Sequence, residues 1–347
     1  MSIKPLKSKA AMLVEYGKPL EIREFPIPEV EPNGILVKVE MAGICGTDVH
    51  QWRGDLAVKR APLPLVPGHE SVGRIIELGK GRVKDSAGQP LSIGDRIMWS
   101  HVSCGNCYAC NILKQPVLCE NRFGYGYNNS LTGSFAEYEY VIPLAQVVKV
   151  PPLLSNEEVV GVCCAFRSVV GAFERLVGIG TQSIVVIQGS GPVGLYSVLM
   201  SNLSGAAKTI TIGAPDLRLS LARKWGADYV LNIEEIIDPA KRSERIREIT
   251  EGRGADIVVE ASGVPSAFNE GLEMLRRGGR YLVIGQTSPK DIQITPATIV
   301  WKNCEIIGQC GAEIGHYYRA LQIVKNNRQR YPFADLITKR LPAVPQR

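Results

Sequence analysis

A short apolar strand that runs directly into a glycine-rich turn constrains the fold of this chain most. The run Ile184–Ile187 is apolar, and Gln188 leads from it into Gly189-Ser190-Gly191-Pro192-Val193-Gly194 and then the helix-patterned segment 195–203. Glycines at this spacing permit a tight turn, close approach of the backbone to a pyrophosphate, and close packing of helix on strand. The motif predicts dinucleotide binding by Gly189, Gly191, Pro192, Val193 and Gly194, with the phosphates at the helix N-terminus.

The regions on either side of this motif differ in pattern. Up to about Pro152 the chain shows short alternating apolar and polar runs separated by proline and glycine, which is typical of a β-rich domain. Beyond it, apolar strands alternate with helix-patterned segments, which predicts βαβ units and a parallel sheet. The expected fold class is α/β, with one β-rich domain and one doubly wound parallel-sheet domain.

Composition narrows the class of protein further. The 347 residues are 45% hydrophobic and 21% charged, which suits two folded domains and argues against disorder. The net charge of +6 is spread without a block of like charge, so no nucleic-acid partner is expected. The opening residues lack the apolar core of a secretory signal, and no uninterrupted apolar run is long enough to span a bilayer. We therefore expect a soluble, cytoplasmic protein without a membrane partner.

Nine cysteines without a secretion signal indicate metal ligands or free thiols. Cys104, Cys107 and Cys110 stand at Cys-x-x-Cys spacing, and Cys119 follows. Four thiolates can close a tetrahedron around zinc with no open position, which is the geometry of a structural site. Buried free cysteines and an iron–sulfur cluster are the weaker alternatives.

A second group of metal-ligating residue types lies in glycine-rich turns. The runs 43–50 and 68–73 contain Cys45, Thr47, His50 and His69, with Glu70 next to the last. Cys45 and His69 could be two ligands of a zinc ion with an open position, which needs a third protein ligand. The doublet Cys163-Cys164 is the nearest source of that ligand. Taken alone, His69-Glu70 is more often an ordinary hydrogen-bonded pair.

The strand after the glycine turn lacks the usual acidic residue for the adenosine ribose. It ends in Gly213-Ala214-Pro215, and Asp216 follows, with Arg218, Arg223 and Lys224 close in sequence. A ribose phosphate would meet less repulsion here and a cation in Arg218. The charges could equally solvate the exposed face of the next helix, so both NAD and NADP remain open.

With these motifs in this order, the chain resembles the zinc-dependent medium-chain alcohol dehydrogenases from about Lys9 to about Arg340. The resemblance includes Gly-His-Glu-x-x-Gly, Cys-Gly-Thr-Asp-x-His, the four-cysteine lobe, Gly-x-Gly-x-x-Gly and the run Glu260-Ala261-Ser262-Gly263. It implies a GroES-like catalytic domain with a structural zinc lobe over 1–160, a Rossmann NAD(P) domain over 161–308, and a return to the catalytic domain over 309–347. The active site would lie between the two domains.

The resemblance also implies a role for each matching residue. Cys45, His69 and Cys164 match the ligands of a catalytic zinc, with Cys163 as the substitute for Cys164, and Glu70 matches the acid beside the histidine. Thr47 matches the hydroxyl that takes the alcohol proton, and His50 matches the imidazole that passes it to solvent. The structural zinc would be held by Cys104, Cys107, Cys110 and Cys119.

The activity so implied is hydride transfer between an alcohol, expected to be a secondary alcohol or polyol, and NAD(H) or NADP(H), with two Zn²⁺ per chain. The family also implies a homodimer or homotetramer that pairs Rossmann sheets edge to edge, here around Glu305–Gly308. Four residues are candidates for an apolar substrate pocket, although core packing is the favoured explanation for each aromatic taken singly: Trp52, His101, Phe123 and Tyr125.

The C-terminal segment departs from the family. Relatives continue into a further helix and strand, whereas Leu341–Arg347 shows no helical period, which predicts an exposed apolar edge and lower stability. A homologue with impaired activity is therefore the alternative function. A zinc-free quinone or enone reductase is a weaker alternative, because such an enzyme needs no set of zinc ligands. A zinc-lobed nucleic-acid-binding or scaffolding protein is also weaker, because cationic residues do not cluster beside the cysteine lobe.

Overall fold

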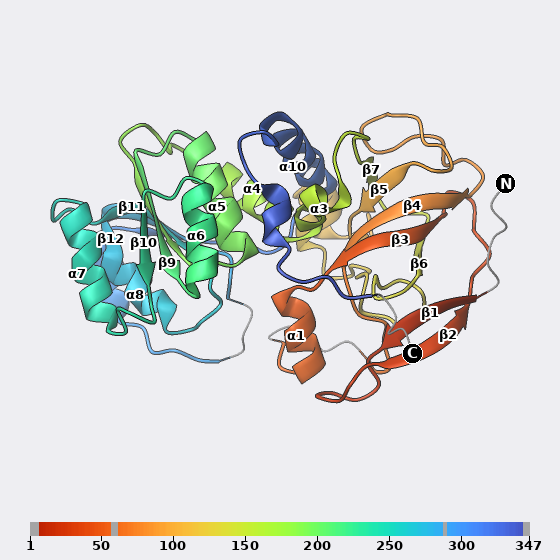
Figure 1. The fold of residues 1–347 in the computed structure, drawn as a ribbon, viewed down its shortest axis with the longest axis horizontal. Coiled ribbons are helices and arrows are strands. Elements are labelled where there is room, and N and C mark those ends of the chain that lie inside the picture. Colours follow the sequence, from red (N-terminus) through yellow and green to blue (C-terminus); the bar gives the residue numbers. More distant parts are fainter. Residues whose placement is uncertain (1–6, 57–61, 287–289, 343–347) are drawn as a thin grey trace. The chain divides into compact units, whose positions relative to one another are not determined.

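The computed structural model describes residues 7–56, 62–286 and 290–342. It divides into two compact units (Figure 1), one comprising the chain up to Arg167 together with the chain from Ala312, the other Ser168–Gly311. The units change over at 167/168 and 311/312, whereas the expected domain limits lie at 160/161 and 308/309. Helix α4 (Ala165–Arg175) carries the chain across the first of these points.

The first unit contains a five-stranded antiparallel sheet in the order β6-β3-β4-β5-β7 and a two-stranded sheet of β1 and β2. The strands are β1 (Lys7–Met12), β2 (Glu21–Pro26), β3 (Ile35–Gly43), β4 (Glu70–Leu78), β5 (Arg96–Trp99), β6 (Tyr138–Val141) and β7 (Val147–Lys149). Alternating residues of β3, β4 and β5 form the core, among them Ile35, Val37, Ile75, Ile97 and Trp99.

The pairing of β3 with β4 decides where the functional residues lie. Its register places Gly43 opposite Glu70, after two shifts in the ladder between Leu36 and Met41. Cys45 therefore follows the end of β3 where His69 precedes the start of β4. Residues far apart in the sequence thus meet at one end of these two inner strands.

Short helices and the returning C-terminal segment complete this unit. They are α1 (Gly46–Arg53), α2 (Tyr108–Asn111), α3 (Asn156–Val159), α10 (Ile314–Asn327) and the 3-10 turns η1 (Pro116–Leu118), η2 (Val160–Cys163) and η3 (Phe333–Leu336). Tyr317, Ala320, Leu321 and Val324 of α10 are buried. Of the predicted irregular tail Leu341–Arg347, the last five residues lie outside the described part of the chain.

The second unit is a six-stranded parallel sheet in the order β10-β9-β8-β11-β12-β13, with helices on both faces (Figure 1). The strands are β8 (Ile184–Gln188), β9 (Lys208–Gly213), β10 (Tyr229–Asn232), β11 (Ala255–Glu260), β12 (Leu275–Val283) and β13 (Glu305–Gly308). The helices are α5 (Pro192–Leu203), α6 (Asp216–Lys224), α7 (Pro239–Ile249), α8 (Ala267–Met274) and α9 (Pro296–Lys302).

This strand order is that of a dinucleotide-binding Rossmann sheet. Strands β9 and β10 are added on one side of β8, and β11, β12 and β13 on the other, so the topological switch point lies between β8 and β11. Strand β8 is buried along its whole length, which accounts for its uninterrupted apolar run. The predicted fold class, a β-rich domain and a doubly wound parallel-sheet domain, is confirmed. In the described part of the chain, no helix combines the length and the apolar character needed to cross a membrane.

Candidate functional site

Four side chains with metal-ligand atoms converge in the first unit. Cys45, His69, Glu70 and Cys164 each offer one ligand atom, and these atoms all lie within 4.8 Å of one another. Cys45 follows β3, His69 directly precedes β4, Glu70 is the first residue of β4, and Cys164 lies between η2 and α4. The structure thus brings together the residues that the sequence predicts as one site.

Helix α1 holds the Cys45 sulfur in place. Cys45 is the N-cap residue, and its Sγ accepts a hydrogen bond of 3.3 Å from the backbone N–H of Thr47. Asp48 completes the capping box, because its Oδ2 accepts a 2.8 Å hydrogen bond from the Cys45 backbone N–H. The first turn of α1 therefore orients the thiol before any ligand binds.

The same aspartate orients His69. Its Oδ1 lies 3.1 Å from Nδ1 of His69, and both side chains are about 5% exposed or less. A carboxylate on Nδ1 fixes a proton there and leaves Nε2 as the other ring atom that can face the cluster, where Cys45 and Cys164 hydrogen-bond to the ring. No role is predicted for Asp48 from the sequence, although the Cys-x-x-Asp spacing of a capping box is a visible signal.

Glu70 occupies space that only a glycine at position 43 leaves open. A Cβ atom on Gly43 would overlap Glu70 Oε2. Burial raises the pKa of Glu70 to about 8, and the negative charge of the Cys45 sulfur adds to this effect. The carboxyl group lies in the same cluster as the three sulfur and nitrogen donors.

The geometry separates the two adjacent cysteines. The Cys163 thiol is buried and donates a 3.1 Å hydrogen bond to the carbonyl oxygen of Ser71, whereas Cys164 turns toward the cluster. The thiol of Cys164 hydrogen-bonds to Cys45, which lowers the pKa of Cys45 and raises that of Cys164. Two sulfur atoms and an imidazole nitrogen therefore meet without an apolar side chain between them, and this donor set suits zinc.

Thr47 and His50 lie one helical turn apart on α1, next to Cys45 in sequence and structure. The His50 ring is 24% exposed and its Nδ1 lies 2.9 Å from Oδ1 of Asp55. The hydrogen bond from His50 lowers the pKa of Asp55. The aspartate thereby orients the ring and leaves Nε2 free.

The four candidates for a substrate pocket have different surroundings. Tyr125 packs in the core against Trp99 and Phe123, with ring centroids 6.3 and 5.5 Å away, so core packing explains Phe123 and Tyr125. Trp52 donates its indole N–H to the carbonyl oxygen of Lys18. His101 alone among them lies beside the cluster, with its ring centroid 6.2 Å from that of His69.

His101 is held as a neutral ring. Its Nδ1 accepts a hydrogen bond of 3.1 Å from the backbone N–H of Tyr125, and burial lowers its pKa well below the usual range. The proton is therefore on Nε2. Tyr127, for which the sequence predicts no role, lies at 6.5 Å from the His69 ring, and its position depends on the fold of the 123–128 loop.

The four-cysteine lobe is formed by one short stretch of chain. The sulfur atoms of Cys104, Cys107, Cys110 and Cys119 lie within 4.8 Å of one another. The Cys107 and Cys110 sulfurs are 3.5 Å apart, and Cys119 Sγ accepts a hydrogen bond from the Cys104 backbone N–H. The backbone N–H of Asn106 lowers the pKa of Cys104 to about 7. All four ligands come from protein, so this geometry suits a closed structural site.

The glycine turn of the second unit has the form that phosphate binding requires. Gly189 has a φ of 118°, and a Cβ there would lie 2.8 Å from the Ala261 backbone. A Cβ on Gly194 would overlap the carbonyl oxygen of Gly189. Gly191 is the N-cap of α5 without a side-chain cap, so the first backbone N–H groups of this helix are left for a ligand.

The end of β9 offers no carboxylate. The strand ends at Gly213, where a Cβ would contact Ser190, and Asp216 accepts a hydrogen bond of 2.7 Å from Asn232. The exposed Arg218 reaches back toward the turn, with Nη1 3.8 Å from the position of a Cβ on Gly191.

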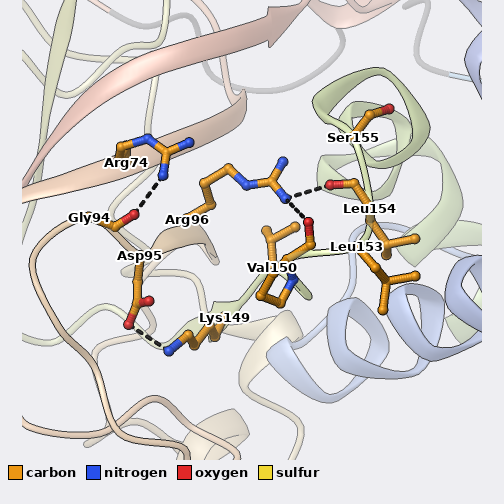
Figure 2. Close-up of a pocket in the computed structure, with 10 residues that line it drawn as sticks. Arg74, Gly94, Asp95, Arg96, Lys149, Val150, Leu153, Leu154 and Ser155 are labelled. Atoms are coloured by element: carbon orange, nitrogen blue, oxygen red, sulfur yellow. Dashed lines mark hydrogen bonds and ion pairs between the residues drawn. The ribbon is translucent and has the colours of Figure 1, made fainter.

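A cavity of about 510 Å³ elsewhere in the first unit is lined by none of the predicted site residues (Figure 2). Its cations are engaged: Lys149 pairs with Asp95 at 2.7 Å, and Arg74 donates to the carbonyl oxygen of Gly94 at 2.7 Å. Arg96 donates to three carbonyl oxygens of the 151–154 turn. These contacts fix the turn before α3 and give the cavity a structural explanation.

Comparison with known families matches both parts of the chain. Residues 31–152 match the alcohol dehydrogenase GroES-like domain, and residues 192–326 match the zinc-binding dehydrogenase family. The chain is 34% identical over 335 residues to 5-exo-hydroxycamphor dehydrogenase of Pseudomonas putida, covering 96% of this chain and 92% of the relative. It is 33% identical to L-threonine 3-dehydrogenase of Burkholderia lata, with 96% and 93% covered.

Solved structures agree with these matches. An alcohol dehydrogenase from Thermotoga maritima superimposes with a TM-score of 0.88 at 36% identity, covering 96% of this chain and 92% of that one. A zinc-binding dehydrogenase from Sinorhizobium meliloti, crystallised with NADP, has a TM-score of 0.78 at 27% identity, with 92% and 89% covered. The resemblance seen in the sequence is confirmed: the chain belongs to the zinc-dependent medium-chain dehydrogenase/reductase family and is an NAD(P)-dependent zinc alcohol dehydrogenase.

Proposed function

We propose that this enzyme transfers hydride between a secondary alcohol and NAD(P), with Cys45, His69 and Cys164 as the centre of the reaction. The observation that carries the proposal is the convergence of their three donor atoms beside the helix that bears Thr47 and His50. The names of two relatives, 5-exo-hydroxycamphor dehydrogenase and L-threonine 3-dehydrogenase, denote secondary alcohols and support this substrate class over primary alcohols. A polyol also carries secondary hydroxyl groups and remains within the proposal.

The donor sets suit two zinc ions of different type. Cys45, His69 and Cys164 would hold the catalytic ion, and Cys104, Cys107, Cys110 and Cys119 the structural one. Three protein ligands leave a vertex for the substrate oxygen, whereas four close the sphere. The bound catalytic ion supplies Lewis acidity toward that oxygen. The carboxyl group of Glu70 lies beside the same three donors.

The side chains of α1 provide a path for the alcohol proton. The Thr47 hydroxyl accepts the alcohol proton as it gives up its own toward the His50 ring, and this partly exposed ring releases a proton to solvent. Asp55 holds His50 Nδ1, so Nε2 is the atom that exchanges the proton. Asp48 meanwhile keeps Cys45 and His69 oriented.

We further propose that the cofactor pyrophosphate binds at Gly189, Gly191, Pro192, Val193 and Gly194, and that NADP is accepted at least as well as NAD. Gly213 removes the carboxylate that would repel a ribose phosphate, and Arg218 stands close to the turn. The Sinorhizobium meliloti relative was crystallised with NADP, which supports this choice.

The proposed oligomer, a homodimer or homotetramer, would form through the edge of the parallel sheet. Strand β13 lies at that edge, with Ile306 38% exposed. Val300 and Trp301 of α9 are about three-quarters exposed, which is unusual for large apolar side chains of a monomer. Light scattering of the wild type and of W301E tests this proposal, and a monomeric wild type would contradict it.

The decisive experiment is a set of initial rates with primary and secondary alcohols, each with NAD and NADP, on protein of known zinc content. We expect turnover with secondary alcohols, two zinc ions per chain, and loss of turnover in C164S. Two zinc ions with cofactor binding but no turnover on any alcohol would instead favour the alternative, a homologue with impaired activity.

A further inference from the structure

A permanently charged side chain is buried three residues after Cys164. Arg167 lies in the first turn of α4 and is 3% exposed. Its Nε donates a 2.6 Å hydrogen bond to the carbonyl oxygen of Cys163, and its Nη1 donates one of 3.3 Å to the carbonyl oxygen of Ala312. The guanidinium carbon also lies 4.9 Å from the ring centroid of Tyr317.

This arrangement is costly without a purpose, because a guanidinium keeps its charge in the protein interior. Its hydrogen bonds go to carbonyl oxygens, and no carboxylate among the described residues lies within ion-pair distance of it. Two carbonyl groups and an aromatic face solvate the charge in place of water. If this position only had to fill space in the core, an apolar side chain would do so without the cost of burying a charge.

The carbonyl group that Arg167 holds belongs to the peptide bond between Cys163 and Cys164. Cys164 has a φ of −139° and a ψ of −69°, outside the helical values that begin again at Ala165. Fixing that peptide group limits rotation about the φ angle of Cys164 and hence the direction of its Cβ–Sγ bond. The Cys163 thiol anchors the same stretch from the other side through Ser71.

The charge of the guanidinium suits the surroundings of the cluster. A divalent ion balances two thiolates, and this leaves the buried Asp48 and the Glu70 carboxyl as further acidic groups. An arginine thus combines a fork for two carbonyl oxygens with a compensating charge.

We infer that Arg167 is a positioning residue of the metal centre, which fixes the backbone that presents Cys164 and ties it to the returning C-terminal segment through Ala312 and Tyr317. This inference rests on the proposed function, because it takes Cys45, His69 and Cys164 as zinc ligands. It assigns to α10 and the residues before it a part in holding the third ligand, although they contribute no ligand of their own.

The test follows each zinc ion by its release to a chromophoric chelator. In R167M we expect one of the two ions to leave about 10- to 100-fold faster than in the wild type, the usual effect of losing a residue that orients a ligand. The second ion, held by the four-cysteine lobe, should leave at the wild-type rate. The cobalt-substituted R167M protein should also show altered absorption from the Cys45 and Cys164 thiolates.

Four further variants separate positioning from charge and from general stability. R167K keeps the charge but cannot reach two carbonyl oxygens in the same way, so it should behave like R167M. Y317F keeps the ring and should match the wild type, whereas Y317L should release zinc at an intermediate rate. R242M is the matched control, because Arg242 is also buried and bonds to carbonyl oxygens and Glu270 in the other unit. It should lower the melting temperature without changing zinc release.

Wild-type zinc release in R167M or in R167K would overturn the inference, and should R167M fail to fold, R167K and Y317L decide it. Failure of the proposed function has a different signature. In that case the wild type would hold zinc at the four-cysteine lobe alone, and C164S would not change its metal content.

Discussion

The two sulfur-rich clusters of this enzyme are built in opposite ways. The lobe takes all four cysteines from the segment Cys104–Cys119, which is held by turns of its own backbone, and only Cys119 of the four is buried. The centre at Cys45, His69 and Cys164 takes its donors from three distant segments and surrounds them with buried carboxyl groups. A local cluster can be predicted from spacing, whereas a cluster of distant residues exists only if the sheet register and the helix starts are right.

The largest expected difference between the two clusters is in catalysis. C164S should lower kcat/KM by about a thousandfold, because the Lewis-acid contribution of several kcal/mol is lost. C107S should instead lower the melting temperature and leave kcat/KM of the folded protein nearly unchanged. Zinc content, initial rates and thermal melts distinguish the two variants. Equal loss of activity in both would remove the distinction between a catalytic and a structural cluster.

The sheet behind the centre contains a buried carboxyl group with its own pH signature. Glu139 on β6 accepts hydrogen bonds from Ser71 at 2.9 Å and from the Trp99 indole at 3.2 Å, and burial raises its pKa to about 8. Between its ordinary pKa of 4.5 and about 8, the folded protein holds a proton that the unfolded chain has lost. The free energy of unfolding must therefore fall as the pH rises through this window.

E139Q removes this titration and keeps both hydrogen bonds, since the amide accepts from the indole and donates to the Ser71 hydroxyl. Between pH 5 and pH 8, the free energy of unfolding should fall in both proteins, but the fall should be smaller in E139Q than in the wild type, by on the order of 3 kcal/mol. Urea unfolding at both pH values measures the difference. Parallel losses in E139Q and wild type would show that Glu139 is not the proton carrier.

The proton path of α1 distinguishes the centre from the lobe in a further way. H50A should lower kcat by about a hundredfold while both zinc ions stay bound, because proton transfer and not metal binding is impaired. D55N should have a smaller effect in the same direction, since the ring remains but loses its orienting partner. Partial restoration of H50A by imidazole buffer would support the role, and an unchanged kcat in all buffers would exclude it.

The smallest predicted effect lies in the second unit. R218A should weaken NADPH binding about tenfold and leave NADH binding unchanged, because a single exposed cation facing a phosphate contributes about 1.4 kcal/mol. R223A, on the same helix, is the matched control and should bind both cofactors normally. Fluorescence titration measures each affinity. An equal loss for both cofactors in R218A would place the guanidinium on the shared pyrophosphate instead.

Much of the site could be predicted because its residue types occur in short informative runs. The Gly-x-Gly-x-x-Gly turn follows a buried strand, and its glycines have the steric reasons that the pattern indicates, at Gly189 and Gly194 in particular. Cys45 and His69 stand at strand ends that pair with each other. Their roles as zinc ligands, and those of Thr47 and His50 in proton transfer, remain predictions for the experiments above.

Other participants could not be predicted, because each depends on a contact between distant segments. Asp48 serves Cys45 and His69 at once, which requires that α1 lie against the start of β4. In the sequence Arg167 looks like an ordinary helix residue, and only the structure shows its hydrogen bonds to the carbonyl oxygens of Cys163 and Ala312. Tyr127 likewise acquires a place beside His69 only through the folded loop.

The sequence by itself determined the two domain types, the glycine turn and the four-cysteine lobe, because these depend on periodicity and on interactions within a few residues. Only the tertiary structure decided which of the two adjacent cysteines turns toward Cys45, which acid orients His69, and where a buried guanidinium is tolerated. Those outcomes depend on strand register and on the direction of side chains from separate segments, and nothing in local spacing encodes the sum of such contacts.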